Sequence, residues 1–514
     1  LFDDGDTIQG TALADWQALG EPPRCDAELA MYKAMDLVGY DAGTIGNHEF
    51  NYGLPFLSQV TGTPFNVDGV AQQPCRGPEF PLVLSNVFGA RDGKPLYRPY
   101  LVIPKTFEAY TPDGSRVSVP LRIGVLGFAP TPILKWDKRN LDGKVTVQGA
   151  VEAAKRWLPD VRAAGADIVI AVAHMGLNPS ADYTSELENA GWHLAGVDGI
   201  DALLLGHSHS VFPAPDDPDS RFATMPEVDN ARGMVRGVPA VMGGFYGRDL
   251  GVIKLALVRR DGRWQVDRAL SHSEVRQVMP ETIADPAIVA AVQTEHMATL
   301  AWLDQPLGKA EVRLSTVFAD IGDTSALGLV NAAQREHVQR WIGKNRPDLA
   351  NVPVLSAAAA FKTGFAGPDD YTDVAPGPLS LRSATNLYLY PNTLAAVAID
   401  GATLKAWLER AAGRFNRIDP AATEPQALIN RKFPGYNFDV IDGGVAYTID
   451  VTKPQGERIV ALTFDGKPVT PQQRFVVATN NYRATDTAIA GLEKAELVID
   501  GGEPNRDVVA AYLR

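Results

Sequence analysis

Hydrophobic and polar residues follow the periods of helices and strands along the first half of the chain. Residues 26–38 are predicted to form a helix that begins at the N-cap Asp26. Met31, Met35 and Val38 fall on one side of this helix, and we expect them to form its buried face. A short strand is predicted directly after it, at residues 41–45.

Continuous apolar runs mark further strands in the same half. Residues 121–128 form such a run, which is typical of a strand covered on both faces. Two more buried strands are predicted at 167–173 and 201–205. Between the strands at 121–128 and 167–173, a helix is predicted over 147–164 because apolar residues recur on one side. Those residues are Val151, Ala154, Leu158 and Val161. The β-α-β order predicts a layered α/β domain.

The pattern changes near residue 285. An amphipathic helix is predicted over 285–303, and the sequence Pro306-Leu307-Gly308 follows it. The second half is predicted to be α+β. Its expected helices are 325–341 and 402–412, and its expected strands are 394–399, 446–451 and 474–478. We therefore expect an N-terminal domain over 1–284, a linker helix over 285–305 and a C-terminal domain over 306–514.

Composition narrows the class of protein. A chain of 514 residues is too long for one ordinary core, and 45% hydrophobic with 21% charged residues is typical of a globular protein. Lys plus Arg number 48 and Asp plus Glu number 61, so the net charge is −13. This charge argues against binding polymeric nucleic acid, although bound metal ions can still hold a small anion. No apolar run is long enough for a transmembrane helix, so we expect no membrane insertion.

The two cysteines and the first residues bear on the compartment. Cys25 and Cys75 permit either one disulfide or two free thiols, and a disulfide would imply an oxidising compartment. Leu1-Phe2 followed by an acidic turn resembles the end of a buried strand, so we expect further residues upstream. An export signal would lie among those residues.

Clusters of polar residues directly follow strand-like runs at four places. They are Asp3-Asp4-Gly5-Asp6, Gly46-Asn47-His48-Glu49, His174 and Gly206-His207-Ser208-His209. Taken singly, Asp3-Asp4-Gly5-Asp6 is more typical of a turn and His174 of a buried histidine, while the cluster at 206–209 is as typical of a loop as of a site. Together they place Asp, Asn and His at the ends of strands, where open α/β sheets build sites. This donor set suits Zn, Mn, Fe or Co, and two such cations about 4 Å apart can clamp the oxygens of a phosphoryl displacement.

These clusters, in this order, resemble the calcineurin-like metallophosphoesterases. Longer motifs resemble one branch of that superfamily, the bacterial periplasmic 2′,3′-cyclic-nucleotide 2′-phosphodiesterase/3′-nucleotidases. The motifs are DGDTIQG (4–10), GNHEFNYGL (46–54), GHSHSVFP (206–213), YPNTL (390–394), YNFDVIDG (436–443) and NNYR (480–483). The resemblance implies an α/β protein with a four-layer α/β/β/α metallophosphoesterase domain at its N-terminus. An α+β nucleotide-binding domain would follow.

The resemblance also implies roles for the clustered residues. Asp6 would bridge two divalent metal ions, and His209 would bind one of them. Asn47, His174 and His207 would bind the other. His48 would act as the catalytic residue beside the phosphate. In this family, the metal bound by His209 also takes an Asp and a His from an upstream motif, which does not precede Asp6 in this sequence.

Aromatic residues of the second half are candidates for holding a nucleobase. The family resemblance implies that Tyr390 and Tyr482 sandwich the base. Asn392 and Asp439 are weaker candidates for polar contacts with the substrate. Stacking on aromatic rings is worth about 1–3 kcal/mol per base.

We expect a dinuclear-metal hydrolase that opens 2′,3′-cyclic nucleotides to 3′-nucleotides and then releases nucleosides. The resemblance implies a periplasmic enzyme whose partners are small nucleotides, and we expect a monomer. A 5′-nucleotidase and a thiosulfate-ester hydrolase are the enzymatic alternatives. Asn51 stands where the 5′-nucleotidase group has Asp, which disfavours the first. A nucleotide-binding surface protein with an inactive metal site is the alternative from another class.

Overall fold

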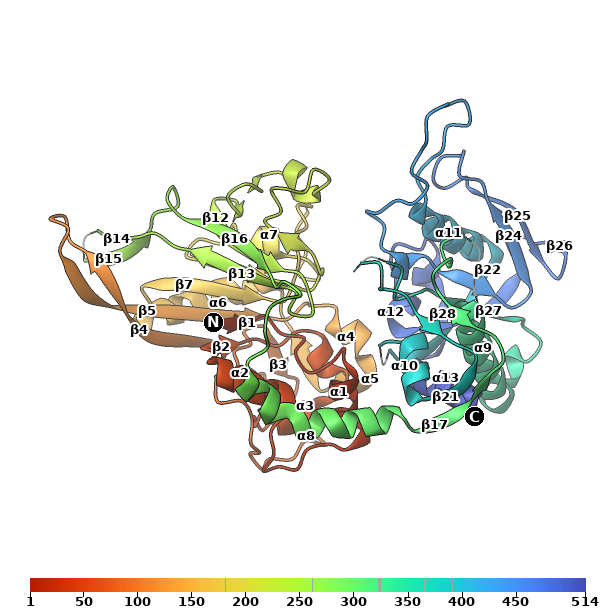
Figure 1. Cartoon of the computed structure of the whole chain (residues 1–514), viewed down its shortest axis with the longest axis horizontal. Helices are drawn as coiled ribbons and strands as arrows, with labels where there is room; N and C mark the ends of the chain where they lie inside the picture. Colours follow the sequence, from red (N-terminus) through yellow and green to blue (C-terminus); the bar gives the residue numbers. More distant parts are fainter. Residues whose placement is uncertain (181, 261, 322–324, 365–366, 391) are drawn as a thin grey trace. The chain divides into compact units, whose positions relative to one another are not determined.

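The structure is a computed structural model of the chain (Figure 1). It describes residues 1–180, 182–260, 262–321, 325–364, 367–390 and 392–514. The chain divides into two compact units, Leu1–Met297 and Ala298–Arg514. The boundary falls inside helix α8 (Pro286–Leu303), within the segment predicted as a linker helix.

The N-terminal unit is built on an eight-stranded sheet. The strand order is β10-β11-β12-β8-β7-β5-β4, and β9 pairs with β12. Its strands are β4 (Tyr100–Tyr110), β5 (Arg116–Phe128), β7 (Ile168–Ala173), β8 (Ala202–Leu205), β9 (Val211–Phe212), β10 (Val228–Asp229), β11 (Met234–Val235) and β12 (Val238–Gly243). The neighbours β5, β7, β8 and β12 are parallel, so their carboxyl ends share one edge of the sheet. The strands predicted at 121–128, 167–173 and 201–205 are confirmed as parts of β5, β7 and β8.

Shorter strands and helices surround this sheet. The paired strands are β1 (Phe2–Asp3) with β2 (Ala42–Gly43), β3 (Val87–Gly89) with β6 (Val145–Val147), β13 (Asp249–Lys254) with β16 (His272–Gln277), and β14 (Leu257–Arg260) with β15 (Arg263–Val266). The helices are α1 (Ala12–Asp15), α2 (Ala30–Val38), α3 (Leu54–Val60), α4 (Ile133–Trp136), α5 (Lys138–Leu141), α6 (Ala150–Ala163) and α7 (Gly191–Leu194). The layered α/β class predicted for this half is confirmed.

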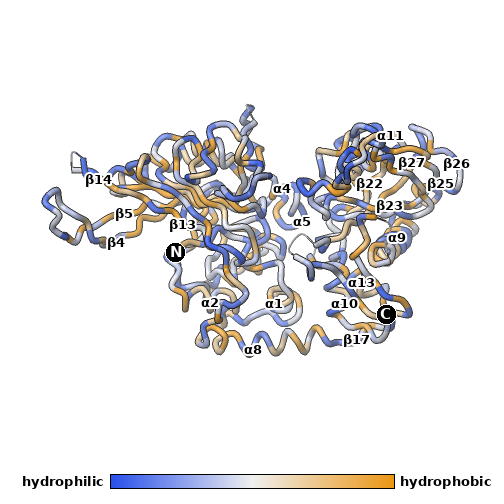
Figure 2. The backbone as a smooth tube through the Cα atoms, turned by 45° about the horizontal axis from the view of Figure 1, so that its top comes forward, coloured by the Kyte–Doolittle hydropathy of each residue, from blue (hydrophilic) through white to orange (hydrophobic). Residues whose placement is uncertain are grey.

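Helix α6 packs as its apolar spacing predicts. Val151, Ala154, Leu158 and Val161 are all buried, and they share a core with residues of β5 and β7. Figure 2 shows hydrophobic residues concentrated along β5.

Helix α2 differs from its prediction at its start and in its buried face. It begins at Ala30, and its N-cap is Leu29, which makes no side-chain capping bond, so Asp26 is not the cap. Met31 and Val38 are 37% and 50% exposed, whereas Tyr32 is 1% exposed. The later start lets the large aromatic ring of Tyr32 enter the core, and an aromatic ring buries more area than the Met31 side chain.

Helix α8 forms where it was predicted, but the prediction that it is amphipathic is wrong. Only Thr299 and Leu303 are buried among its residues, and Val289 and Met297 are 51% and 56% exposed. Its apolar residues are spread around the helix, and hydrophobic and hydrophilic residues alternate along it in Figure 2. No single side of such a helix gathers enough apolar area to become a core face.

The C-terminal unit contains a five-stranded sheet in the order β23-β19-β27-β22-β28. These strands are β19 (Val354–Ala358), β22 (Leu394–Asp400), β23 (Val440–Asp442), β27 (Arg474–Asn480) and β28 (Glu496–Ile499). One core lies on the side of α9 (Ser325–Asn345), and a second lies on the side of α11 (Gly401–Ala411). The predicted α+β character, with helices at 325–341 and 402–412, is confirmed.

The remaining elements of this unit are short. They are β17 (Pro306–Ala310), β18 (Leu314–Ser315), β20 (Asp373–Val374), β21 (Gly377–Ser380), β24 (Val445–Ile449), β25 (Ile459–Phe464), β26 (Lys467–Pro468), α10 (Leu381–Leu387), α12 (Asn481–Ala484) and α13 (Asn505–Leu513). The strands predicted at 394–399, 446–451 and 474–478 are confirmed as β22, β24 and β27.

Two further features can be read from the structure. Cys25 and Cys75 form a disulfide, so the bridged alternative is confirmed and the pair of free thiols is wrong. Among the described residues, no helix combines the length and the apolar character needed to cross a membrane.

Candidate functional site

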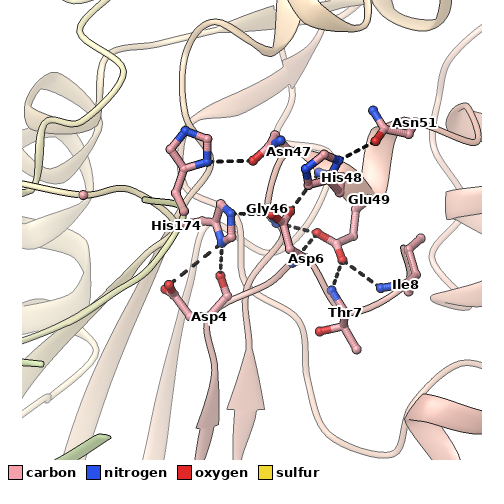
Figure 3. A network of polar contacts seen from close by, with 12 residues as sticks. Asp4, Asp6, Thr7, Ile8, Gly46, Asn47, His48, Glu49, Asn51 and His174 are labelled. Atoms are coloured by element: carbon pink, nitrogen blue, oxygen red, sulfur yellow. Dashed lines mark hydrogen bonds and ion pairs between the residues drawn. The ribbon is translucent and has the colours of Figure 1, made fainter. Parts of the chain in front are cut away.

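The predicted metal-binding residues come together in the N-terminal unit, from loops that follow four strands. Asp6 follows β1 and Asn47 follows β2, while His174 comes directly after β7. His207 and His209 follow β8. Figure 3 shows the loop of Asp6, the loop of Asn47 and the end of β7 meeting at one place. The ligand atoms of Asp6, His174 and His207 lie within 4.8 Å of one another.

The backbone of these loops is strained where the donors lie. Asp6, His207 and His209 have positive φ angles of 61°, 61° and 55°. Such angles cost free energy for residues with a Cβ and cluster at functional sites. Gly46 allows the first two loops to touch, because a Cβ at that position would lie 2.2 Å from Asp6 Oδ1.

Glu49 ties the loop after β1 to the loop after β2. Its carboxylate accepts hydrogen bonds from the backbone N–H of Asp6 at 2.8 Å, of Thr7 at 2.5 Å and of Gly46 at 2.7 Å. The side chain is buried, and burial together with the nearby Asp6 raises the pKa of Glu49 to about 7. Sequence reasoning assigned no role to Glu49, although its place after His48 in the polar cluster was a usable signal.

The ring of His174 contacts the carboxylate of Asp6 and the backbone of Asp4. Its Nε2 is 2.7 Å from Asp6 Oδ2, and its Nδ1 is 2.7 Å from the backbone oxygen of Asp4. Burial alone would lower the pKa of His174, but the charges of Asp6 and Asp4 outweigh it and raise that pKa to about 10. Burial would in turn raise the pKa of Asp6, but His174 and His48 hold it well below its usual range.

His207 is held on three sides. Its Nδ1 is 2.9 Å from Asn47 Oδ1, and its Nε2 is 2.7 Å from Glu188 Oε1. The ring of Trp136 stacks on it with centroids 5.5 Å apart and an interplanar angle of 27°. Sequence reasoning missed Glu188 and Trp136, since neither follows a strand-like run and neither belongs to a recognised motif.

The ring of His209 packs against an aromatic side chain. It stacks on Phe245 with centroids 4.9 Å apart and an interplanar angle of 21°. Burial lowers the pKa of His209 to about 4, although the nearby Asp6 opposes this. The ring is therefore neutral at pH 7, which is the form that binds metal ions.

The residues present fit divalent cations. Asp6, His174 and His207 supply a mixed oxygen and nitrogen donor set in a largely buried place. Both carboxylate oxygens of Asp4 are buried, and within the described part of the chain they have no hydrogen-bond partner. Burial raises the pKa of Asp4 well above its usual range, and His174 only partly offsets this. Bound cations would supply the positive charge that these buried carboxylates lack.

His48 lies beside this donor set at the end of a short polar chain. Its backbone N–H donates to Asp6 Oδ1 at 2.8 Å, and its Nδ1 is 2.6 Å from Asn51 Oδ1. Asn51 Nδ2 donates to Asp137 Oδ2 at 2.7 Å. Asp137 is buried, and burial raises its pKa to about 6. No sequence signal links Asp137 to this site, because 86 residues separate it from Asn51.

The predicted substrate residues lie in the C-terminal unit, where hydrogen bonds join the segment before β22, which carries Tyr390 and Asn392, to α12, which carries Tyr482. Thr393 and Asn481 exchange these bonds, at 3.0 Å between Asn481 N and Thr393 O and at 3.2 Å between Thr393 N and Asn481 Oδ1. Tyr390 precedes the first position and Tyr482 follows the second. Pro391 of the YPNTL motif lies outside the described residues.

Tyr390, Asn392 and Tyr482 are half-buried. The ring of Tyr390 meets that of Phe361 edge to face at 5.1 Å between centroids. The side chain of Asn392 bonds to the Tyr388 hydroxyl. The roles of Tyr390, Tyr482 and Asn392 in substrate binding stay predictions.

Asp439 is a buried member of an internal network. It is 3% exposed, accepts a hydrogen bond from Trp407 Nε1 at 2.8 Å and pairs with Arg483 Nε at 2.7 Å. Arg483 also pairs with Asp486 at 2.7 Å and donates to the backbone oxygen of Tyr436 at 3.0 Å. This arrangement is typical of residues that position the neighbouring loops, and a direct contact of Asp439 with substrate stays a prediction. Sequence reasoning named the NNYR motif but assigned no role to Arg483.

A phosphoesterase domain with Asp, Asn and His at its strand ends, followed by an α+β domain, defines a metallophosphoesterase of the 5′-nucleotidase type. The family model of the 5′-nucleotidase C-terminal domain matches residues 306–488. The solved 5′-nucleotidase precursor of Thermus thermophilus has a TM-score of 0.60 at 20% identity and covers 100% of this chain and 86% of its own. The calcineurin-like phosphoesterase YfkN of Bacillus subtilis has a TM-score of 0.51 at 34% identity, over 59% of this chain and 84% of its own.

A curated relative narrows the class. The 2′,3′-cyclic-nucleotide 2′-phosphodiesterase/3′-nucleotidase of Salmonella typhimurium is 41% identical over 535 aligned residues, which cover 100% of this chain and 78% of the relative. The chain belongs to the 2′,3′-cyclic-nucleotide 2′-phosphodiesterase/3′-nucleotidase family. Calcineurin-like phosphoesterases, the superfamily of this group, use divalent metal ions.

Proposed function

We propose that the protein hydrolyses 2′,3′-cyclic nucleotides to 3′-nucleotides and then dephosphorylates these to nucleosides. The observation that carries this proposal is the convergence of Asp6, Asn47, His174 and His207 at one place in the N-terminal unit, in a chain 41% identical to an enzyme of that name. The products follow from the chemistry. Opening the cyclic phosphate at the 2′-oxygen leaves a 3′-monoester, which a second hydrolysis at the same site converts to nucleoside and phosphate.

Two divalent cations, drawn from Zn, Mn, Fe and Co, fit the proposed reaction. Asp6 would bridge them, with His209 on one cation and Asn47, His174 and His207 on the other. When bound, such cations activate water and neutralise charge on the phosphate. The carboxylate of Asp6 and the neutral ring of His209 would hold their positions through the reaction.

His48 is the residue we assign to the leaving oxygen. Its Nδ1 is turned to Asn51 at 2.6 Å, so Nε2 is the ring nitrogen we assign to the substrate. Because Nδ1 donates to Asn51 Oδ1, only the doubly protonated ring also carries a proton on Nε2, and transfer of that proton to the departing 2′-oxygen would make it a better leaving group. The backbone N–H of His48 is bonded to Asp6, which fixes the ring's base beside the predicted bridging ligand.

The partners we propose are small nucleotides. Tyr390 and Tyr482 would stack the base, with Asn392 and Asp439 near its polar edge. A net charge of −13 disfavours polymeric nucleic acid as a substrate, and we propose that the protein acts as a monomer. The Cys25–Cys75 disulfide supports a periplasmic location, because disulfides persist in oxidising compartments.

The test is product analysis with metal-loaded protein. Protein loaded with Mn or Zn is incubated separately with 2′,3′-cyclic AMP, 3′-AMP and 5′-AMP, and the products are separated by chromatography. We expect the cyclic substrate to pass through 3′-AMP to adenosine, with 5′-AMP left nearly intact. Turnover of 5′-AMP alone would make the protein a 5′-nucleotidase. Nucleotide binding without any turnover would favour a binding protein with an inactive metal site.

A further inference from the structure

We propose that Glu188 is a positioning residue for His207. Its carboxylate would fix the tautomer and the orientation in which the imidazole meets a cation. This inference rests on the metal site of the proposed function, but it concerns a residue outside the predicted ligand set. Glu188 Oε1 lies 2.7 Å from His207 Nε2.

The hydrogen bond selects one tautomer of His207. A carboxylate oxygen accepts, so the ring proton lies on Nε2 and the lone pair lies on Nδ1. Nδ1 faces Asn47 Oδ1, a second lone-pair atom, at 2.9 Å. Two donors that each lie about 2.1 Å from a cation at right angles are about 3 Å apart. The tautomer fixed by Glu188 therefore aims His207 at the same point as Asn47.

The backbone that carries Glu188 is anchored to the loop of another predicted ligand. The next residue, Asn189, accepts a hydrogen bond through Oδ1 from the backbone N–H of Gly176 at 2.7 Å. Gly191 N donates to Gly176 O at 3.1 Å. Gly176 follows His174 by two residues, so one short segment supports both histidine loops. A carboxylate on an anchored backbone loses less side-chain freedom when it holds its partner.

Stacking on Trp136 does not by itself determine the orientation of the His207 ring. The stacking of Trp136 on His207, at an interplanar angle of 27°, fixes the plane of the imidazole. Stacking does not determine which ring edge faces Asn47, because a half-turn about the Cβ–Cγ bond keeps the plane. The hydrogen bond from Nε2 to Glu188 fixes that edge. Carboxylates behind metal-binding histidines orient the ring in this way.

The experiment compares Glu188→Ala, Glu188→Gln and the matched control Glu186→Ala in the full chain. Glu186 lies two residues away, but its side chain is 76% exposed and pairs with Lys135 at 3.1 Å. Affinity for Zn²⁺ and Co²⁺ is measured by competition with a chelating dye, and the visible absorption of the Co²⁺ forms reports donor geometry. Melting of the metal-free proteins, followed by circular dichroism, shows that each variant folds.

Glu188→Ala should weaken one cation by about 10- to 100-fold and change the Co²⁺ absorption. Glu188→Gln should retain most of the affinity, because its amide oxygen accepts the same hydrogen bond. Glu186→Ala should match the wild type. Wild-type affinity in Glu188→Ala would overturn this inference alone. Equal losses in the Ala and Gln variants would also overturn it, because they would indicate a direct ligand. A wild-type chain that binds no cation would overturn the proposed function as well.

Discussion

Successive hydrogen bonds link the His48 ring to Asn51 and Asn51 to the carboxylate of Asp137. Asn51 contacts the His48 ring directly, and Asp137 accepts from the Asn51 amide at 2.7 Å. An amide between ring and carboxylate transmits orientation without placing a full charge on the ring. The sequence analysis singled out Asn51 by its difference from the 5′-nucleotidase group, and only the fold revealed its contact with Asp137.

The buried Asp137 carboxyl should make stability depend on pH. Burial raises its pKa from 3.8 to about 6, so between these values the folded state holds more proton than the unfolded state. The free energy of unfolding should therefore fall as pH rises through that window, by about 3 kcal/mol in total. Asp137→Asn should remove this contribution. Denaturant unfolding of wild type and variant at pH 4 and pH 7 measures it, and parallel pH dependences of the two proteins would contradict it.

The grouping of donors that follow strands could be predicted from the sequence, although their roles as metal ligands stay predictions, whereas contacts that depend on the fold could not be predicted. Asp6, Asn47, His174 and His207 were predicted because each follows a strand-like run. Their supports could not be predicted in this way. Asp137 and Glu188 lie 86 and 19 residues from their partners, on loops whose paths depend on tertiary packing.

At the scale of elements, Glu49 joins two loops that both carry donors. Glu49→Gln would place an amide N–H₂ against backbone N–H groups of the loop after β1 or of Gly46, where both carboxylate oxygens now accept. We expect this to lower the free energy of unfolding by about 1–3 kcal/mol and to weaken cation binding. Denaturant unfolding and metal competition measure the two effects.

Glu79→Gln is the control for that substitution. The Glu79 side chain is exposed, and the hydrogen bonds of this residue to Asp36 come from its backbone N–H, so the change should leave both quantities unaltered. Full cation affinity in Glu49→Gln, with stability unchanged, would show that the two loops hold their positions without the hydrogen bonds to the Glu49 carboxylate.

The success of element prediction followed the clarity of the period. The residues of α6 and β7 that were predicted to be buried are buried, and in the run 121–128 of β5 only Arg122 is exposed. Helix α2 was misjudged because Asp26 offered a good cap three residues before Leu29, where the chain caps the helix. Capping preference is worth about 1 kcal/mol, which burial of one aromatic ring exceeds.

At the scale of the whole molecule, the Cys25–Cys75 disulfide closes a long loop in the N-terminal unit. The cysteines are 50 residues apart in sequence, so the chain-entropy model gives about 4 kcal/mol of stabilisation. The double variant Cys25→Ser, Cys75→Ser should melt at a lower temperature, and reduction of the wild type should give the same shift. Neither half-cystine is among the predicted metal ligands, so cation affinity of the folded variant should be unchanged. An unshifted melting temperature would contradict the prediction.

The predicted metal ligands lie in the unit Leu1–Met297, and the predicted base contacts lie in the unit Ala298–Arg514. Replacing Tyr390 and Tyr482 by Ala should raise KM for 2′,3′-cyclic AMP by about 5- to 150-fold, from a stacking loss of about 1–3 kcal/mol. The same variant should hydrolyse the 2′,3′-cyclic phosphate of 1-O-methylribose, which lacks a base, as fast as the wild type does.

The comparison of these two substrates separates binding of the base from chemistry at the phosphate. The matched control is Tyr512→Ala, because Tyr512 is an aromatic residue of the same unit, 41% exposed and far in sequence from both motifs. Its KM should equal that of the wild type on both substrates. Equal losses on both substrates in the double tyrosine variant would mean that Tyr390 and Tyr482 support the fold of the C-terminal unit. A loss confined to the nucleotide would place base selection in one unit and hydrolysis in the other, joined through α8.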